Sequence, residues 1–184
     1  MNNTYCIHTG QLRAAQDRLQ AGDRVLLSGT IFTARDAAHK RLFALLDEGK
    51  ARPLPLKDTV IYYAGPTPAQ QDMAVGACGP TTASRMNVFA PRLLDLGLGA
   101  IIGKGQMSAE VSEALIRNRS CFFAAVGGAG ALIAKCIKRA DVIAFDDLGC
   151  ESIKRLTVEN LPLTVAIDCH GGNLYESGRT AYQN

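Results

Sequence analysis

Short apolar runs alternate with longer amphipathic segments along most of this chain, and this alternation limits the fold more than any other feature. We expect strands over 24–27, 60–64, 100–102, 121–126, 142–145 and 163–167, and helices over 34–48, 81–96, 109–118 and 129–138. Strands that alternate with helices in this way are typical of layered α/β proteins. Because no linker interrupts residues 1–184, the sequence predicts a single α/β domain.

The predicted helix over 34–48 has recognisable ends. Thr33 can cap it, with Asp36 three residues later as an imperfect capping box, and Gly49 follows as the stop. Its buried stripe is formed by Ala38, Leu42, Leu45 and Leu46. Beyond it, 51–56 is the clearest loop, and we expect the polar tail after Tyr175 to be loosely held or used at an interface.

The segment 76–86, GACGPTTASRM, places two adjacent hydroxyls and an arginine at the expected start of the helix over 81–96. Pro80 suits a first helical position. The unpaired N–H groups and the positive dipole end at such a terminus favour an anion, and they make a cation in the first turn mildly unfavourable. Arg85 therefore needs another reason to be there. The segment predicts an anion beside Thr81, Thr82 and Arg85.

Two further cations follow apolar runs. Arg35 lies in SGTIFTARD, and Lys104 lies in IGKG, where the neighbouring glycines let the backbone come close to a ligand. Together with Arg85 they suit a small di-anion, because bidentate pairing between arginine and carboxylate fixes orientation as well as charge. The alternative is that Arg35 and Arg85 are solvated or serve local caps, since exposed charges contribute little.

These segments carry a family resemblance. SGTIFTARDAAHKRL, GPTTASRM and IGKG, in this order and at these separations, resemble the beta region of the iron–sulfur hydro-lyases of the fumarate hydratase and L(+)-tartrate dehydratase family. The late segment 166–174, AIDCHGGNL, looks like the closing strand and turn of that family. The match covers roughly 22–175. It implies the swivelling β/β/α domain of the fumarase C-terminal type, which periodicity alone does not supply.

The resemblance implies the beta subunit of an iron–sulfur fumarate hydratase, which interconverts fumarate and L-malate. It implies a 4Fe-4S cluster held by three cysteines of a separate alpha region, with no metal held by this chain. A chain of this size that begins at Met1 resembles the two-subunit form, so we expect a cluster-bearing alpha subunit, an alpha2beta2 heterotetramer, and no activity for this chain alone.

Site residues also follow from the resemblance. Arg35, Arg85 and Lys104 would fix the dicarboxylate, and Thr81 and Thr82 would hydrogen-bond it. Thr81, more than Thr82, is the candidate for proton transfer, and because an isolated hydroxyl is a poor base it needs an adjacent cation or a partner carboxylate. Arg35 and Arg85 join Thr81 as catalytic candidates.

Three other functions stay open. An L(+)-tartrate dehydratase beta subunit would use the same cations on a diol, and a non-catalytic anion-binding or assembly module would use them without chemistry. A nucleotide-binding protein that used 103–105 would lack the hydroxyl residue that follows the lysine of a phosphate loop.

Composition excludes several partners. The chain has 20 basic and 17 acidic residues, and the basic ones are scattered rather than clustered, which argues against nucleic acid. The longest run of apolar residues and glycine, 121–134, is shorter than the roughly 20 residues that a membrane span needs.

The six cysteines include no C-x-x-C pair, so a metal site made by this chain is not expected. Buried reduced thiols, and the lack of a signal peptide at 1–3, point to a cytoplasmic protein. Cys78 is the exception to watch, since it could lie near a cluster held by the partner, although packing is the favoured reading.

The three histidines have open roles. His8 is expected to be structural or exposed. His39 follows Arg35 by four residues and so shares its helix face, where it could meet the anion or orient Asp36. His170 lies in a turn beside Asp168, and this pair could belong to a site or to the scaffold.

Overall fold

The computed structural model describes residues 3–69 and 71–182. Within these ranges, seven strands form one sheet in the order β1-β2-β3-β4-β5-β7-β6. A second pairing, between β2 and β7, closes β2, β3, β4, β5 and β7 into a five-stranded barrel. The strands are β1 (Thr4–His8), β2 (Arg24–Thr33), β3 (Val60–Tyr62), β4 (Ala100–Gly103), β5 (Cys121–Ala124), β6 (Ile137–Ala144) and β7 (Ile153–Ile167).

The barrel mixes strand directions. Strands β2, β3, β4 and β5 run parallel to one another. Strand β7 is antiparallel to both β2 and β5. Because the first four are parallel, their carboxyl ends meet at one end of the barrel, which is where ligands bind in many α/β proteins.

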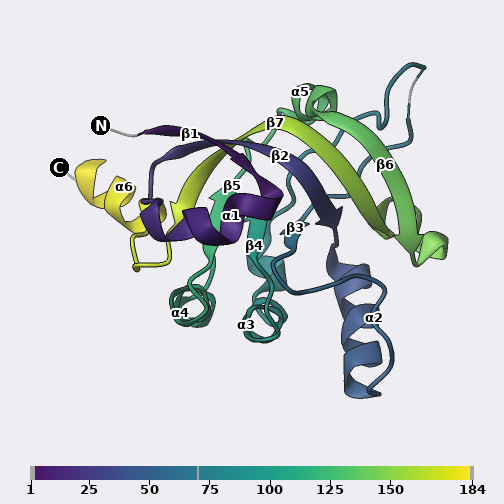
Figure 1. The fold of residues 1–184 in the computed structure, drawn as a ribbon, viewed down its shortest axis with the longest axis horizontal. Helices are drawn as coiled ribbons and strands as arrows, with labels where there is room; N and C mark the ends of the chain where they lie inside the picture. Colours follow the sequence, from purple (N-terminus) through teal and green to yellow (C-terminus); the bar gives the residue numbers. More distant parts are fainter. Residues whose placement is uncertain (1–2, 70, 183–184) are drawn as a thin grey trace.

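Helices cover the sheet on different sides. Figure 1 shows α2, α3 and α4 on the lower side of the view and α5 on the upper side. The α-helices are α1 (Thr9–Ala15), α2 (Asp36–Asp47), α3 (Ala90–Asp95), α4 (Ala109–Arg117), α5 (Gly130–Cys136) and α6 (Leu174–Tyr182), and the 3₁₀ helices are η1 (Gln16–Arg18), η2 (Ala83–Met86) and η3 (Asp146–Glu151).

The two faces of the strands feed two separate apolar cores. In β3, Val60 and Tyr62 pack into one core, whereas Ile61 and the following Tyr63 pack into the other. Successive side chains of a strand point to opposite faces, so a strand that is buried on both faces reads as a continuous apolar run. This explains why β3, β4 and β5 could be predicted, and the layered arrangement agrees with the expected β/β/α domain.

The predicted helix over 81–96 is wrong as a continuous element. Residues 83–86 form η2, and an α-helix begins only at Ala90, with Pro91 in its first turn. The backbone before η2 is bonded elsewhere: the Thr81 N–H donates to the Tyr63 carbonyl (2.7 Å), and the Lys104 N–H donates to the Thr81 carbonyl (3.2 Å). Backbone pairing with residues just beyond β3 and β4 therefore replaces the first helical turn that Pro80 predicted.

The predicted cap of α2 is also wrong. Thr33 is the last residue of β2, and its hydroxyl accepts a hydrogen bond from the Lys154 N–H (3.1 Å) across the sheet. Arg35 occupies the cap position and makes no side-chain cap bond. Gly49 does end the helix, with a left-handed φ of 65°. On the buried face His39 joins Ala38 and Leu42, while the expected Leu45 and Leu46 are only half-buried.

Other differences concern the starts of two strands and the two ends of the chain. The strand predicted over 163–167 begins at Ile153, and the one predicted over 142–145 begins at Ile137. The segment before Arg24 forms β1, α1 and η1, and most of the polar tail forms α6. The loop over 51–56 contains no helix or strand, as expected. None of the helices in 3–69 and 71–182 is long and apolar enough to cross a membrane.

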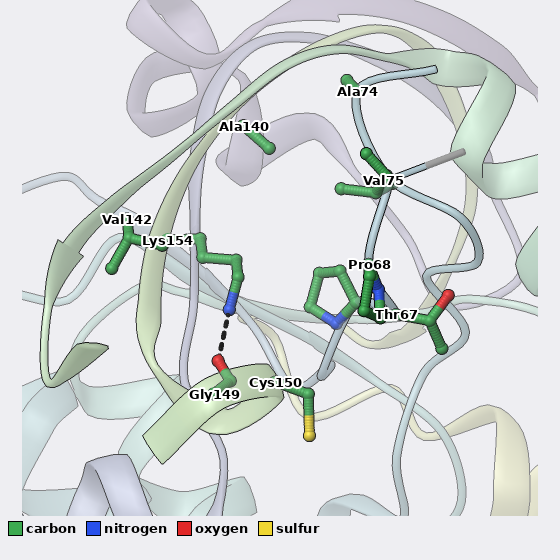
Figure 2. A pocket seen from close by; sticks show the side chains of 11 residues that line it. Thr67, Pro68, Ala74, Val75, Ala140, Val142, Gly149, Cys150 and Lys154 are labelled. Carbon is green, nitrogen blue, oxygen red and sulfur yellow. Dashed lines mark hydrogen bonds between the residues drawn. The ribbon is translucent and has the colours of Figure 1, made fainter. Parts of the chain in front are cut away.

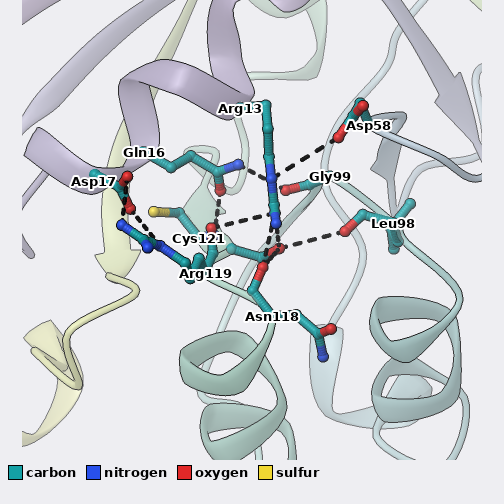
Figure 3. Close-up of polar contacts among 10 residues, drawn as sticks. Arg13, Gln16, Asp17, Asp58, Leu98, Gly99, Asn118, Arg119 and Cys121 are labelled. Atoms are coloured by element: carbon teal, nitrogen blue, oxygen red, sulfur yellow. Dashed lines mark hydrogen bonds and ion pairs between the residues drawn. The ribbon is translucent and has the colours of Figure 1, made fainter.

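A buried glutamine ties η1 to the barrel, as Figure 3 shows. The Gln16 side chain has no exposed surface; its Nε2 donates to the Gly99 carbonyl (3.0 Å), and its Oε1 accepts from the Cys121 N–H (2.5 Å). Nearby, the Arg13 guanidinium donates to the Asn118 carbonyl (2.7 Å). The Gln16 side chain thus satisfies backbone groups at the starts of β4 and β5.

Candidate anion-binding site

Arg35 lies directly beyond the carboxyl end of β2, at the start of α2. An added Cβ at Gly65 would lie 2.8 Å from Arg35 Nη1 and 3.1 Å from the Cys150 carbonyl oxygen, so only glycine leaves room for the guanidinium here. Arg35 Nη2 lies 3.6 Å from Glu151 Oε1, and Arg35 Nε is buried without a hydrogen-bond partner. The guanidinium is therefore confined but keeps an unused N–H group.

Thr81 and Arg85 approach the same helix start from the segment that follows β3. The Thr81 N–H bond to the Tyr63 carbonyl places this segment beside the end of β3. Arg85 Nη2 donates a short hydrogen bond to Thr81 Oγ1 and lies 3.4 Å from Asp36 Oδ2. Arg85 therefore links the threonine hydroxyl to the first turn of α2.

Lys104 completes the group from the end of β4. Its carbonyl accepts the Ala83 N–H (2.8 Å), and its backbone pairs with that of Thr82, which is exposed. An added Cβ at Gly127 would lie 3.4 Å from Lys104 Cδ, so a small residue there leaves space for the lysine. The structure thus brings all five predicted residues to one end of the barrel.

Partnerless polar atoms gather at this place. In the described part of the chain, four buried side-chain atoms lack a hydrogen-bond partner: Arg35 Nε, Asp36 Oδ2, His39 Nε2 and Tyr63 Oη. Arg85 lies close to Asp36 Oδ2 as an ion pair, but without hydrogen-bond geometry. Buried polar groups are nearly always satisfied, so these four atoms, which lie at the start of α2, within it and just beyond β3, are unusual for a folded chain.

His39 lies beneath this site rather than in it. It is fully buried; its Nδ1–H donates to the Arg35 carbonyl (2.8 Å), which fixes Nε2 as an acceptor. Its ring stacks on Phe89 and meets Tyr63 edge-on. Burial lowers the pKa of His39 to about 4, so the ring is neutral near pH 7. It connects the Arg35 carbonyl to Tyr63, just beyond β3, and to Phe89, between η2 and α3.

Two carboxylates, from Asp36 and Glu151, lie against the cations. Glu151 Oε2 also accepts the Ala37 N–H (3.0 Å) in the first turn of α2, a favourable position for a negative group. Sequence analysis considered Asp36 as part of a capping box and as a group that His39 could orient, and it did not identify Glu151. The register of β2 with β7, in which Thr33 lies opposite Lys154, brings Glu151 to Arg35, and this pairing leaves no local sequence signal.

His170 and Asp168 serve the scaffold. The Asp168 carboxylate accepts backbone N–H groups of Ala21 (2.8 Å), His170 (2.9 Å) and Gly172 (2.9 Å). Its pairing with His170 therefore runs through the backbone of the turn. The His170 ring forms its own hydrogen bond with the Asp17 carbonyl through Nε2 (2.8 Å).

The cysteines are partly as expected. Cys78, Cys121 and Cys169 are buried, but the expectation of buried thiols is wrong for Cys6 and Cys150, which are exposed. Burial raises the pKa of the Cys78 thiol to about 12, and this side chain packs in the same apolar core as Tyr62 and Val75. Within 3–69 and 71–182, no group of three or more His, Cys, Asp or Glu side chains could hold a metal ion.

A separate cavity of about 290 Å³ lies between the segments 66–69 and 74–75, strand β6 and the turn before β7 (Figure 2). Lys154 and Cys150 line it together with mainly apolar residues, and Lys154 Nζ donates to the Gly149 carbonyl (2.8 Å). None of the five predicted site residues lines this cavity. The chemistry of the candidate site therefore rests on the converging cations and not on this hollow.

Comparisons with known proteins agree with the resemblance. Residues 4–178 match the family model described as Fumarase C-terminus. The chain is 34% identical over 167 residues to Fumarate hydratase 2 of Leishmania major, which covers 90% of this chain and 29% of that protein. Against "Fumarate hydratase class I, anaerobic" of Escherichia coli it is 33% identical, over 90% of this chain and 31% of that protein.

A shorter relative aligns over most of its length. The protein named "Putative L(+)-tartrate dehydratase subunit beta" in Methanocaldococcus jannaschii is 38% identical over 165 residues, which cover 86% of this chain and 85% of that protein. The chain thus spans less than a third of the two fumarate hydratases, but most of this subunit.

Proposed function

The chain belongs to the fumarase C-terminus family, and from this premise we propose that it is the beta component of an iron–sulfur fumarate hydratase. In this proposal it adds water reversibly to fumarate to give L-malate, together with a cluster-bearing alpha subunit in an alpha2beta2 assembly. We also propose that residues 1–184 act as a single domain, located in the cytoplasm.

The observation that carries the proposal is the convergence of Arg35, Arg85 and Lys104 on one end of the barrel, beside the Thr81 hydroxyl. Fumarate and malate each present two carboxylates. Arginine binds a carboxylate through two parallel N–H groups, and the guanidinium of Arg35, whose side chain is 23% exposed, has an Nε–H without a protein partner. The cations would thereby bind and orient both ends of a small di-anion.

Thr81 is the proposed proton-transfer group. Its oxygen already accepts a hydrogen bond from Arg85, so its own proton is directed elsewhere, and the adjacent guanidinium favours a negatively charged oxygen. A threonine hydroxyl needs an adjacent cation for this role, and Arg85 is such a cation. Thr82 is assigned to substrate binding.

The cluster is assigned to the partner. The donor set of this chain does not fit it: the site offers arginine, lysine and threonine, and the neighbouring Cys78 is buried in an apolar core. In the proposal, a cluster bound by the partner would supply Lewis-acid chemistry to the substrate. The residues of this chain bind the substrate, orient it and move a proton at its carbon.

The second candidate is the L(+)-tartrate dehydratase beta subunit, which converts tartrate to oxaloacetate with its alpha partner. One observation favours it: this chain covers 85% of a relative named for that function and under a third of the two fumarate hydratases. The same cations would bind both dicarboxylates.

The deciding experiment co-expresses this chain with a cluster-bearing alpha chain, reconstitutes the cluster anaerobically and assays fumarate, malate and tartrate side by side. Arg85→Lys keeps the charge but loses the planar geometry, so kcat/KM should fall at least about tenfold. Arg92→Lys is the matched control, because Arg92 pairs with Asp47 on the surface (2.5 Å). Equal kinetics for the two variants would contradict the proposed role of Arg85.

A further inference from the structure

Glu151 connects the turn before β7 to the beginning of α2. Its Oε2 accepts the Ala37 N–H (3.0 Å), and its Oε1 lies 3.6 Å from Arg35 Nη2. Both charged side chains are about three-quarters buried, with 25% and 23% of their surface exposed. One carboxylate therefore contacts both the backbone of the helix start and the guanidinium beside it.

The turn that carries Glu151 is held by several bonds. The Ser152 hydroxyl and the Lys154 ammonium both donate to the Gly149 carbonyl, at 2.8 Å each. The Thr33 hydroxyl donates to the Ser152 carbonyl (3.4 Å) from the end of β2. Glu151 thus projects from a fixed backbone.

Arg35 has little freedom between its neighbours. Gly65 and the Cys150 carbonyl lie on one side of the guanidinium, as the short distances from a Cβ built on Gly65 show. Glu151 lies at the Nη2 end, outside hydrogen-bond distance, so it attracts the guanidinium without occupying its N–H groups. The buried Nε stays without a protein partner.

We propose that Glu151 is a positioning residue that holds the Arg35 guanidinium in the orientation that receives one carboxylate of the substrate. The substrate role of Arg35 rests on the proposed function, whereas the pairing itself rests on the contacts above. An arginine side chain loses considerable rotamer freedom when it is fixed. A carboxylate that restricts it before the substrate arrives lowers the cost of binding.

The test replaces Glu151 with glutamine, which keeps an oxygen for the Ala37 N–H but removes the charge. A partly exposed ion pair contributes about 0.5–1 kcal/mol, so the ratio of held to released Arg35 should fall roughly two- to fivefold. In the purified chain, labelling of Arg35 by phenylglyoxal, followed by peptide mass spectrometry, should become faster by this factor. The melting temperature should stay within a few degrees.

Asp147→Asn is the matched control. Asp147 belongs to the same turn and pairs with Arg41 (2.5 Å), so its replacement should speed the labelling of Arg41 and leave that of Arg35 unchanged. Unchanged Arg35 labelling in Glu151→Gln would overturn the inference.

The assembled enzyme gives the second readout. A group that positions a ground-state contact changes KM and leaves kcat alone. In Glu151→Gln, KM for the dicarboxylate should rise by up to about fivefold, because only the held orientation binds, while kcat stays within about twofold of wild type. An unchanged or lower KM would overturn the positioning role. A wild-type enzyme that turns over neither fumarate nor tartrate would instead overturn the proposed function, and the labelling experiment decides the pairing in either case.

Discussion

Acidification should destabilise this protein through His39 before most carboxylates titrate. Burial lowers the pKa of His39 from 6.5 to about 4 in the folded chain. Between these two values the unfolded state binds a proton that the folded state does not, so stability rises with pH and is lost as pH falls through this window. Lowering the pH from about 7.5 to about 5 should therefore cost about 2 kcal/mol of unfolding free energy.

His39→Phe isolates this contribution. A phenylalanine ring retains the stacking on Phe89, and the Arg35 carbonyl keeps its hydrogen bond from the backbone N–H of residue 39 (2.8 Å). Urea unfolding of both proteins at both pH values gives four free energies. Carboxylates titrate in both proteins, so the variant should lose about 2 kcal/mol less than wild type on acidification. Equal losses would refute a buried, neutral His39.

Two further predictions concern single contacts. Gln16→Leu leaves the Gly99 carbonyl and the Cys121 N–H without their partner, so urea unfolding should show a loss of about 2–5 kcal/mol. The exposed Gln11→Leu in α1 should stay within about 0.5 kcal/mol of wild type. Gly65→Ala places a methyl group 2.8 Å from Arg35 Nη1, so the KM of the assembled enzyme should rise; an unchanged KM would argue against Arg35 as a substrate ligand.

The sequence predicted which end of the strands the candidate residues occupy better than it predicted the element that carries Thr81, Thr82 and Arg85. Arg35 and Lys104 follow the ends of parallel strands, and the carboxyl ends of such strands meet at one edge whatever the loops do. The prediction of one helix over 81–96 was wrong because the backbone that follows Pro80 pairs with Tyr63 and Lys104. Such long-range backbone hydrogen bonds override a local helix signal.

The contacts that position Arg35 and His39 could not be predicted from local sequence patterns. The strand β7 was predicted only over its last five residues, which are mostly apolar, because its first part alternates buried and exposed positions and contains Pro162. Unless the full length of β7 is known, the register that places Lys154 opposite Thr33 cannot be predicted. The approach of Glu151 to Arg35 depends on that register and could not be predicted either. The burial of His39 could not be predicted either, because Tyr63 and Phe89, which cover it, come from segments distant in the sequence.

The most direct test of the central claim is the steady-state kinetics of Thr81→Val in the assembled, cluster-loaded enzyme with fumarate and tartrate. The account predicts that kcat falls at least about a hundredfold, the range for a proton-transfer or charge-stabilising group. Thr82→Val should mainly raise KM, and both variants should melt within a few degrees of wild type. Normal turnover combined with an early melting transition in Thr81→Val would show that this hydroxyl serves only the fold, and would contradict the proposed catalytic site.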